Sequence, residues 1–562
     1  MLDPINRRQR LLARKSALWT ERSSWLTHWR EISDYQQPRA GRFVASDRNR
    51  GDKRTNHILD NTAVFGARTL AAGLMSGITS PARPWFRLEI KDKELMESGP
   101  VKAWLHDCAT LLRAIFASSN TYRSLHTIYE ELGLFGTGAS VLLPDFDNVV
   151  HHYPMTIGEY ALATDAKGNV NTLAREFQMT VEQMALQFGK DNLSVTARNL
   201  YDKGAYDAGV DVVHMVEPRR ERDMSKMDGK NKRFASYYIE PGQDNSDRYL
   251  SESGFNRFPA LTPRWVVTGN DVYGTSPGME CLGDVKQLQH QQLRKGQAID
   301  YQVNPPLQVP SKYKEAHKAR LPGGVFYVDS MGQQGGVRSA FDVQLNLQHL
   351  MVDIQDVRER IRSAYYADLF LMLANDNRSG ITATEVAERH EEKLLMLGPV
   401  LERLHNELLQ PLIDTTFEYA AEAGILPEAP PELEGMELSV EFISVLAQAQ
   451  RAVATQGMDR LLGTVSQMAA VNPNVLDKIN FDQVVDDYGN AYGVNPKIIV
   501  PDDVAAGIRQ QRAQAQQAAQ SAAVAPQVVD SAKTASEIDT GNLQDVLTAL
   551  QGYSSVSPAP MA

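Results

Sequence analysis

The chain has little cysteine: of its 562 residues only Cys108 and Cys281 are cysteines. Two thiols cannot build the disulfide framework of a small secreted domain, and their surroundings do not suggest a metal site. The longest run of small and apolar residues, 70–78, is far shorter than the roughly 20 residues that a membrane span needs. The basic N-terminus is not followed by the apolar stretch of a signal peptide. These absences predict a protein that folds in the cytosol and carries no membrane segment.

The sequence also lacks the motifs of common catalytic sites. The Gly-Lys pairs at 189–190 and 229–230 have neither the upstream glycine nor the following hydroxyl residue of a phosphate-binding loop. Residues 274–278, GTSPG, match the G-x-S-x-G pattern of serine hydrolases. The residue after the serine is Pro277, however, which has no N–H to donate to an oxyanion. We therefore expect neither an enzyme nor a cofactor.

Two groups of residues with ligand-type side chains are expected to be structural. The pair His151 and His152 has no cysteine or carboxylate at ligand spacing, so we expect it on a strand surface. The group Asp482, Asp486 and Asp487 is expected on the solvated face of a helix rather than around an ion.

The charge is negative overall and unevenly distributed. A net charge of −11 argues against a protein that holds nucleic acid tightly by neutralising its phosphates. Residues 1–60 nevertheless carry 13 Arg and Lys against 7 Asp and Glu, whereas residues 421–510 carry 5 against 13. One end of the chain is basic and the other is acidic.

The first 280 residues read as a mixed block of helices and strands. Leu11, Leu18, Trp25 and Ile32 recur every seven residues and predict an amphipathic helix over 6–35. Further helices are expected at 60–78, which is rich in small residues that let helices pack closely, and over 101–136. Strands are expected just after Pro84 and at 139–143, 148–153, 210–216, 234–240 and 264–268.

A helical hairpin is predicted after residue 280. The polar helix 281–300 leads into prolines that favour an extended segment, and residues 321–336 read as a glycine-bounded strand. A second helix then has apolar residues at alternating steps of four and three, which is typical of a narrow stripe packed against another helix. The residues of this stripe are Val343, Leu347, Leu350, Ile354, Val357, Ile361 and Ala364.

A long amphipathic helix with a proline inside it is expected over 380–413. Thr382 or Thr384 can cap its start. Pro399 lacks a backbone donor and crowds the preceding turn, so the helix must bend there. After a linker, residues 436–444 alternate like a strand, 445–495 suggest short helices, and the polar residues beyond about 520 suggest partial disorder.

Three segments of the chain resemble one known family. They are DNTA…LAAGL…SG.TSPARPWFRL within 60–88, DVYGTSPG…L.D.K.L within 271–290, and TATEV…R…EK…LGPV…RL…PLI within 380–413. Together they resemble the head-to-tail connector (portal) proteins of short-tailed, double-stranded-DNA phages. The resemblance implies a ring, usually of twelve copies, at one vertex of the capsid, with double-stranded DNA passing through its channel. It also implies capsid protein, a terminase packaging motor and tail adaptor proteins as partners, and a place in the virion after synthesis in the host cytoplasm.

The resemblance also implies a division of the chain. The fold class is α+β, mainly α, with a wing, a helical stem, a small β-containing clip and a helical crown. The expected regions are the wing (1–280), stem helix 1 (281–300), the clip (301–343), stem helix 2 (344–368), the tunnel loop (369–383), the kinked helix with its return to the wing (384–444), the crown (445–520) and a flexible tail (521–562).

Several residues follow as candidates for function. The tunnel loop contributes Asn375, Asp376, Asn377 and Arg378, of which Arg378 is expected to touch phosphates. On the stem, Lys286, Arg294 and Lys295 either make weak contacts with DNA or pair with Asp353, Asp356 and Glu359 across the two helices. The apolar stripe is expected to pack against a neighbour rather than in a monomeric core. Two alternative functions remain: another virion head–tail joining protein without a DNA channel, and a DNA-processing enzyme.

Overall fold

The computed structural model describes most of the chain. The described residues are 4–44, 57–96, 98–226, 228–241, 249–303, 307–308, 338–339, 348–374, 397–433, 438–443, 461–470, 472–491, 500 and 504–516. The chain divides into two compact units, Met1–Pro473 and Asn474–Ala562. The described elements are mainly helical with antiparallel sheets, which confirms the α+β, mainly α, fold class. Among the helices in these ranges, none combines the length and apolarity that crossing a bilayer requires.

The first predicted helix is two helices. α1 (Pro4–Glu21) and α2 (Ser23–Tyr35) are separated at Arg22, whose buried guanidinium donates to the carbonyl oxygens of Gly158, at 2.9 Å, and Tyr160. The predicted apolar face is confirmed, since Leu11, Leu18 and Ile32 are buried. The break lets α1 and α2 cover different parts of the molecule.

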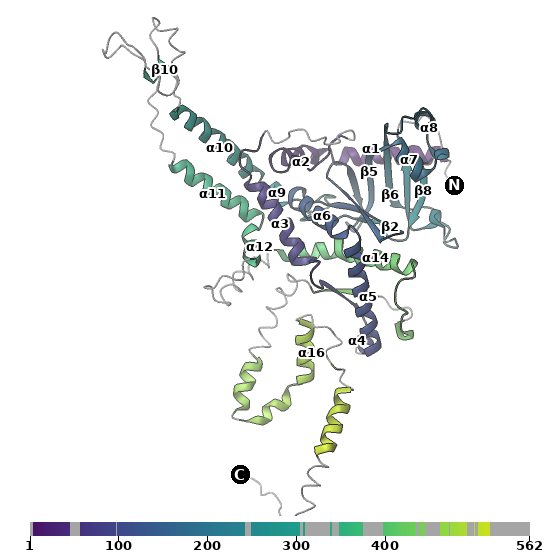
Figure 1. The fold of residues 1–562 in the computed structure, drawn as a ribbon, viewed down its shortest axis with the longest axis vertical. Coiled ribbons are helices and arrows are strands. Elements are labelled where there is room, and N and C mark those ends of the chain that lie inside the picture. Colours follow the sequence, from purple (N-terminus) through teal and green to yellow (C-terminus); the bar gives the residue numbers. More distant parts are fainter. Residues whose placement is uncertain are drawn as a thin grey trace, which may run out of the picture. The chain divides into compact units, whose positions relative to one another are not determined.

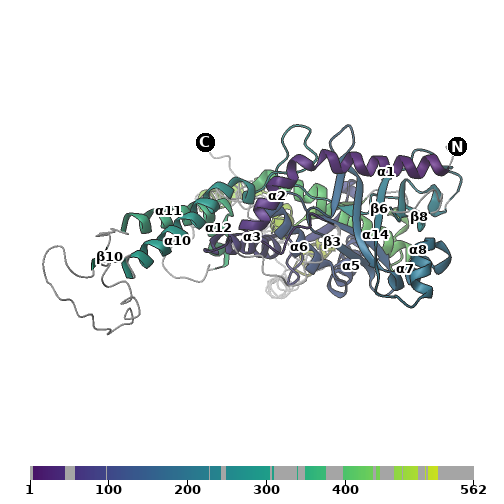
Figure 2. The same cartoon turned by 90° about the horizontal axis from the view of Figure 1, so that it is seen from above.

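A five-stranded antiparallel sheet forms one end of the first unit, in the order β4-β5-β6-β7-β8. Tyr237 packs in one cluster with α1, whereas its neighbour Tyr238 packs in another with residues of α7 and α8. Adjacent strand residues point to opposite faces, so both faces of this sheet are covered (Figure 2). The elements are β4 (Tyr160–Thr164), β5 (Val170–Thr180), α7 (Val181–Phe188), α8 (Val195–Asp202), β6 (Gly209–Pro218), β7 (Phe234–Ile239) and β8 (Ser251–Phe255).

A smaller sheet in the order β3-β2-β9 lies beside α6 (Thr121–Phe135). Its strands are β2 (Ala139–Asp145), β3 (Val149–Met155) and β9 (Ala260–Leu261). The prediction of a strand at 264–268 is wrong, because Arg264 and Val266 form only isolated bridges. The expected surface position of His152 is also wrong. Its ring is 1% exposed and bonds Thr121, because this face of β3 is covered by α6.

The main core lies among helices that the sequence predicted well. α3 (Thr62–Ile78) and α6 pack together with α5 (Gly99–Ser118), and a short α4 (Lys93–Met96) precedes α5. The small residues of α3 allow close packing as expected: a Cβ on Gly73 would lie 2.1 Å from Cγ of Phe370. The predicted strands β1 (Phe86–Ile90) and β12 (Leu438–Phe442) pair antiparallel, which returns the chain to the core.

A helical hairpin projects from this body (Figure 1). α9 (Pro277–Glu280) leads into α10 (Leu282–Val303), and α11 (Gln348–Ala364) lies beside α10 in both views. Between them in sequence, β10 (Leu307–Gln308) and β11 (Arg338–Ser339) pair antiparallel. The predicted helix, β insert, helix succession is therefore present.

The chain after the hairpin contains a helical irregularity. α12 (Ala367–Ala374) follows α11, residues 397–404 are helical, η5 (His405–Leu409) is a π-helix, and α14 (Gln410–Glu422) follows. Pro411 has no N–H to donate to the carbonyl of Glu407. The ordinary α-helical hydrogen bond is therefore missing at this point, which favours the wider turn of a π-helix. Pro399 lies in the helical segment 397–404, but the residues before 397 fall outside the described ranges, so the predicted bend there remains a prediction.

The predicted crown, residues 445–520, contains helices where it is described. Residues 461–469 are helical, η7 spans Pro473–Lys478 and α16 spans Phe481–Ala491. A helix over 504–516 is joined to α16 by an ion pair between Arg509 and Asp482, with Nη2 and Oδ1 2.5 Å apart. Residues 521–562 lie outside the described ranges.

Candidate functional site: the helical hairpin and its base

The apolar stripe of α11 packs inside its own chain. Ile354, Val357 and Ile361 are fully buried and belong to the main hydrophobic core. Leu350 and Ala364 are partly buried against the same core, whereas Val343 and Leu347 lie outside the described residues. The expectation that this stripe packs against a neighbour instead of a monomeric core is therefore wrong for its described part. The reason is α3, which packs against α11 while α10 covers it from another side.

A buried aspartate ties both hairpin helices to α3. The Oδ2 atom of Asp60 accepts hydrogen bonds from Arg358 Nη2 at 2.7 Å and Gln292 Nε2 at 3.0 Å. Its Oδ1 atom accepts from the backbone N–H of Thr62 at 2.9 Å, at the start of α3. Burial alone would raise the pKa of Asp60, but the bonds from Thr62 and Arg358 outweigh burial and lower it. Asp60 is therefore an anion that fixes the base of the hairpin.

Some of the polar side chains of α10 form hydrogen bonds at this same junction. Gln289 is buried, accepts from the backbone N–H groups of Leu59 and Asp60 at 2.6 and 2.8 Å, and donates back to the Asp60 carbonyl at 2.9 Å. Gln291 donates to Asp353. The sequence pattern did not single out Asp60 or Gln289, because the bonds that join them across this junction link residues more than 200 positions apart.

The charged candidates of the hairpin form other pairs than those predicted. Lys286 lies 2.9 Å from Glu31 of α2 and over the ring of Tyr35. The ion pair that joins α10 to α11 is instead Arg360 with Asp284, at 3.2 Å. Asp356 pairs with Arg360 on its own helix, and Glu359 accepts from Gln355.

Arg294 and Lys295 keep their charges available. Arg294 is exposed and donates to Gln297 of its own helix at 3.1 Å. Lys295 is half-buried, and neither cation has a carboxylate partner among the residues that the structure describes. Of the two open alternatives, cross-helix pairing is therefore not found for these residues within the described part of the chain, and contact with DNA stays a prediction.

The outer part of the hairpin exposes apolar side chains. These residues are Leu293 (46%), Ile299 (39%), Tyr301 (52%) and Val303 (79%) on α10, and Met351 (44%) and Val352 (66%) on α11. Single exposed apolar residues are ordinary, but a series along two adjacent helices is typical of a contact surface.

Buried hydrogen bonds hold the base of the hairpin to the body. Tyr365 is fully buried, and its hydroxyl bonds Gln36, which in turn donates to the carbonyl of Gly278 at 2.8 Å. Ser276 caps α9 by accepting from Met279 N–H at 3.0 Å and donates to the carbonyl of Leu134 at 2.7 Å. The GTSPG sequence is therefore a structural turn in which the serine hydroxyl is already engaged.

The part of the chain that follows α11 was expected to begin the tunnel loop and instead forms a helix. Residues 369–374 were assigned to the tunnel loop, but they belong to α12, because Leu369 and Phe370 are buried against the core. Tyr366, with φ of 53°, makes the turn between α11 and α12. The predicted tunnel-loop residues Asn375, Asp376, Asn377 and Arg378 lie outside the described residues.

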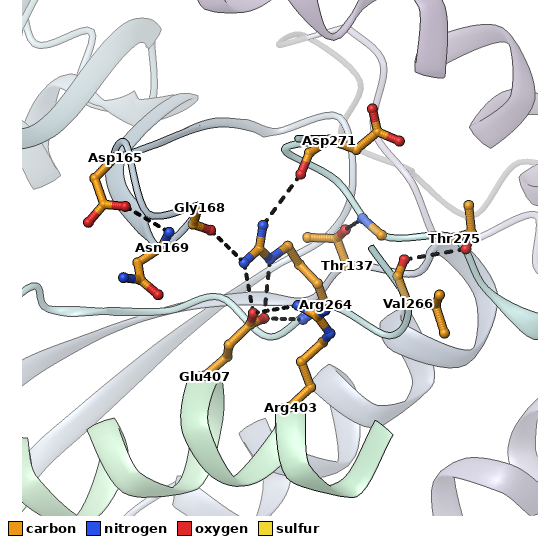
Figure 3. A network of polar contacts seen from close by, with 11 residues as sticks. Thr137, Asp165, Gly168, Asn169, Arg264, Val266, Asp271, Thr275, Arg403 and Glu407 are labelled. Carbon is orange, nitrogen blue, oxygen red and sulfur yellow. Dashed lines mark hydrogen bonds and ion pairs between the residues drawn. The ribbon is translucent and has the colours of Figure 1, made fainter. Parts of the chain in front are cut away.

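A buried arginine attaches the π-helix to the body (Figure 3). Arg264 is 4% exposed; its Nη2 atom lies 2.7 Å from Glu407 Oε1, and its Nε donates to Oε2 at 3.2 Å. The same guanidinium donates to the carbonyls of Gly168, at 2.9 Å, and Asp271. Arg403 also pairs with Glu407, at 3.2 Å. Neither Arg264 nor Glu407 was a candidate from the sequence, where each reads as an ordinary charged residue.

Comparison with known proteins gives the same family over most of the chain. The family model "Bacteriophage head to tail connecting protein" matches residues 8–500. A "Probable portal protein" of Bordetella phage BPP-1 is 56% identical over 549 residues, covering 97% of this chain and 99% of the relative. A "Portal protein" of Salmonella phage epsilon15 is 45% identical over 544 residues, covering 97% and 98%.

Solved structures give weaker likenesses. A chain of the "Virion of native gene transfer agent (GTA) particle" matches with a TM-score of 0.35 and 11% identity, covering 77% of this chain and 94% of that one. A chain of the "Neck of empty GTA particle computed with C6 symmetry" matches with a TM-score of 0.36 and 12% identity, covering 76% and 92%. TM-scores this low support no conclusion.

Proposed function

The chain belongs to the family of bacteriophage head to tail connecting proteins, and on that premise we propose that it is a portal protein. Copies of the chain, twelve in the usual case, form a ring at one vertex of the capsid. Double-stranded DNA enters during packaging and leaves during ejection through the axial channel. The protein is structural and not an enzyme.

The observation that carries this proposal is the extent of the similarity. The relatives named as portal proteins align over 97% of this chain at 56% and 45% identity, without a large unmatched region on either side. A shared module inside an otherwise different protein would leave such a region. The role of the whole relative therefore transfers to the whole chain.

The regions have distinct roles in this proposal. The mixed body, residues 1–280, is the wing; α10 and α11 are the stem; the segment 301–343 between them is the clip. The clip docks the terminase motor during packaging and the tail adaptors afterwards, while other surfaces of the ring contact capsid protein. The loop containing Arg378 lies in the channel, and residues 445–520 form the crown.

The exposed outer part of the hairpin supports contact between copies. Leu293, Tyr301 and Val352 are at least 46% exposed in the single chain, which leaves apolar area for a neighbouring copy to cover. A head-to-tail contact of this kind closes into a ring when its rotation allows. The buried stripe of α11 then stabilises each hairpin, and the exposed residues join one hairpin to the next.

The charge suits a channel through which DNA slides. Each copy has a net charge of −11, so the ring as a whole does not attract phosphates strongly. Arg294 and Lys295, which have no carboxylate partner among the described residues, provide weak and salt-sensitive contacts.

The native mass of the purified chain tests the proposal. Twelve copies of 62.5 kDa have a mass of roughly 750 kDa, and negative-stain images should show a ring with an axial hole. A large assembly without a hole would contradict the portal function and favour a joining protein without a channel. If the chain stays monomeric, assembly with the capsid scaffold is the deciding measurement, and a monomer there too would contradict the proposal.

A further inference from the structure

A cavity of about 500 Å³ lies in the body, away from the hairpin. It is lined by the first two turns of α6, by β3 from His151 to Met155, by β5 from Arg175 to Phe177, and by Arg42 and Glu159. Its size falls in the usual range for small-molecule sites, about 300–1,000 Å³. No role in the proposed ring depends on it.

The cavity contains a buried cation without a counter-charge. Arg175 is 9% exposed, and its Nε donates to Nδ1 of His214 at 3.1 Å. Its guanidinium lies 4.6 Å from the ring centre of Phe177 and 5.7 Å from that of Tyr153. Among the described residues it has no carboxylate partner. The aromatic rings offset part of the cost of burying the charge, and an anion would offset the remainder.

The carboxylates that line the cavity are already paired. Glu159 forms an ion pair with Arg42, and Glu176 lies 2.8 Å from Lys15 of α1. Arg123 of α6, which is exposed, has no ion-pair partner within the described part of the chain. Two guanidinium groups, those of Arg123 and Arg175, are therefore left to attract an anion.

The N-terminus of α6 adds backbone donors at the same place. Asn120, which precedes this 15-residue helix, lines the cavity together with Ser124 one turn later. The side chain of Asn120 is bonded to the backbone of His152, so it does not cap the helix, and the first turn contains no acidic residue. The Thr121 N–H donates to Ser119 Oγ at 3.4 Å, and the positive end of the helix dipole favours a bound anion.

A buried, neutral imidazole lies in the lining of the cavity. His152 is 1% exposed, its Nε2 lies 3.0 Å from Thr121 Oγ1, and its Nδ1 is buried without a partner. Burial lowers the pKa of His152 to about 3, so the ring is neutral. The imidazole therefore adds no charge of either sign to the lining of the cavity.

We propose that this cavity binds a phosphate group, either free inorganic phosphate or the phosphate of a small monoester. A phosphate dianion matches the two uncompensated guanidinium groups in charge, and its several oxygens can accept from Arg123, Arg175 and the α6 N-terminus together. A single carboxylate has half this charge and fewer acceptor positions.

Calorimetric titration of the full-length protein with inorganic phosphate tests the proposal, with a nucleoside monophosphate as the ester and acetate as the carboxylate. We expect one phosphate site per chain and weaker or no binding of acetate. Tighter binding of the nucleoside monophosphate would identify an ester as the ligand, whereas equal binding would identify free phosphate. No phosphate binding at millimolar concentration, or acetate binding equally well, would overturn the proposal.

Two substitutions locate the site. Arg123→Gln removes an exposed guanidinium and should weaken phosphate binding about tenfold or more, as loss of a charge-assisted hydrogen bond does. Arg222→Gln, at an exposed arginine in the β6–β7 connection, makes the same charge change away from the cavity and should leave the affinity unchanged. Equal affinities of the two variants would place any bound phosphate elsewhere. Arg175→Lys, checked for folding by circular dichroism, should weaken binding because lysine cannot reproduce the guanidinium fork.

Discussion

Arg264 and Glu407 form a bidentate ion pair that holds the π-helix against the body, although they are 143 positions apart in the chain. The glutamate lies in the π-helix that precedes Pro411, and the arginine lies in the segment after β9, where that segment meets the β4–β5 turn. A helix that is irregular at one point is therefore fixed to the rest of the molecule at that same point (Figure 3).

Glu407→Gln should destabilise the first unit. It leaves the guanidinium of Arg264 buried without a negative partner, and breaking a buried pair from one side costs about 3 kcal/mol or more. The measurement is chemical denaturation followed by tryptophan fluorescence. Glu402→Gln is the matched control, because Glu402 is exposed on the same helical segment, and it should change the stability little. Equal stability of the two variants would contradict the role assigned to the pair.

Gly73→Ala should disturb the packing of α12 on α3. The added Cβ would overlap the ring of Phe370, whose Cγ would lie 2.1 Å away, and overpacking a core costs about 1–3 kcal/mol. Differential scanning calorimetry should show a lower melting temperature. Gly283→Ala in α10 meets no atom within 4 Å, so alanine's better helix propensity should leave stability equal or raise it slightly. If Gly73→Ala melts at the same temperature as the wild type, α12 can shift to make room for the added methyl group without loss of stability.

Glu131 should make stability depend on pH. Burial raises its pKa to about 8 from 4.5, although Thr156 Oγ1 and Ile157 N–H donate to it at 2.6 and 2.9 Å. The native state therefore holds a proton that the unfolded chain releases near its ordinary pKa. The contribution of this proton to the free energy of unfolding is fully present below about pH 4.5 and is lost as the pH rises through about 8.

Glu131→Gln tests this, because glutamine stays neutral at every pH. As the pH is raised from 5 to 8.5, the melting temperature of the variant should rise relative to that of the wild type. Glu130→Gln, a neighbouring and less buried position on the same helix, should show no such trend. A constant difference for Glu131→Gln would mean that this carboxyl is not protonated in the folded protein.

Arg378→Ala tests the proposed tunnel loop. If the guanidinium touches the DNA backbone in the channel, its loss should reduce DNA packaging or retention while leaving ring assembly intact. Packaging by particles that contain the variant portal measures this effect. Asn377→Ala, which removes no charge, is the control. Packaging and retention at the wild-type level for Arg378→Ala would exclude this role.

Pro399→Ala tests the proposed bend. Proline in a helix interior is disfavoured by about 3 kcal/mol, so alanine should increase local helix stability. A straighter helix should at the same time disturb ring geometry, seen as fewer closed rings or less packaged DNA. Rings that assemble and package normally would show that a bend at this position has no part in function.

Local patterns predicted the elements whose burial follows a simple period. The seven-residue repeat in 6–35 and the small residues of 60–78 each produced the expected type of element, because one face of each is buried. The strands β4 and β5 were missed, since both are covered on two faces or interrupted by polar residues and so do not alternate clearly. The break at Arg22 was missed because its cause is a pair of carbonyls more than 130 positions away.

The sequence by itself determined the class of fold, the helix–β–helix hairpin and the family, since periodicity and family-specific segments are properties of consecutive residues. Only the tertiary structure decided which charges are paired. It placed Asp60 between Gln292 and Arg358 and paired Lys286 with Glu31. It also left Arg175, which lines a cavity, without a carboxylate partner among the described residues. The energy of a charged group depends on burial and on partners within a few ångströms, and distance along the chain carries no information about either.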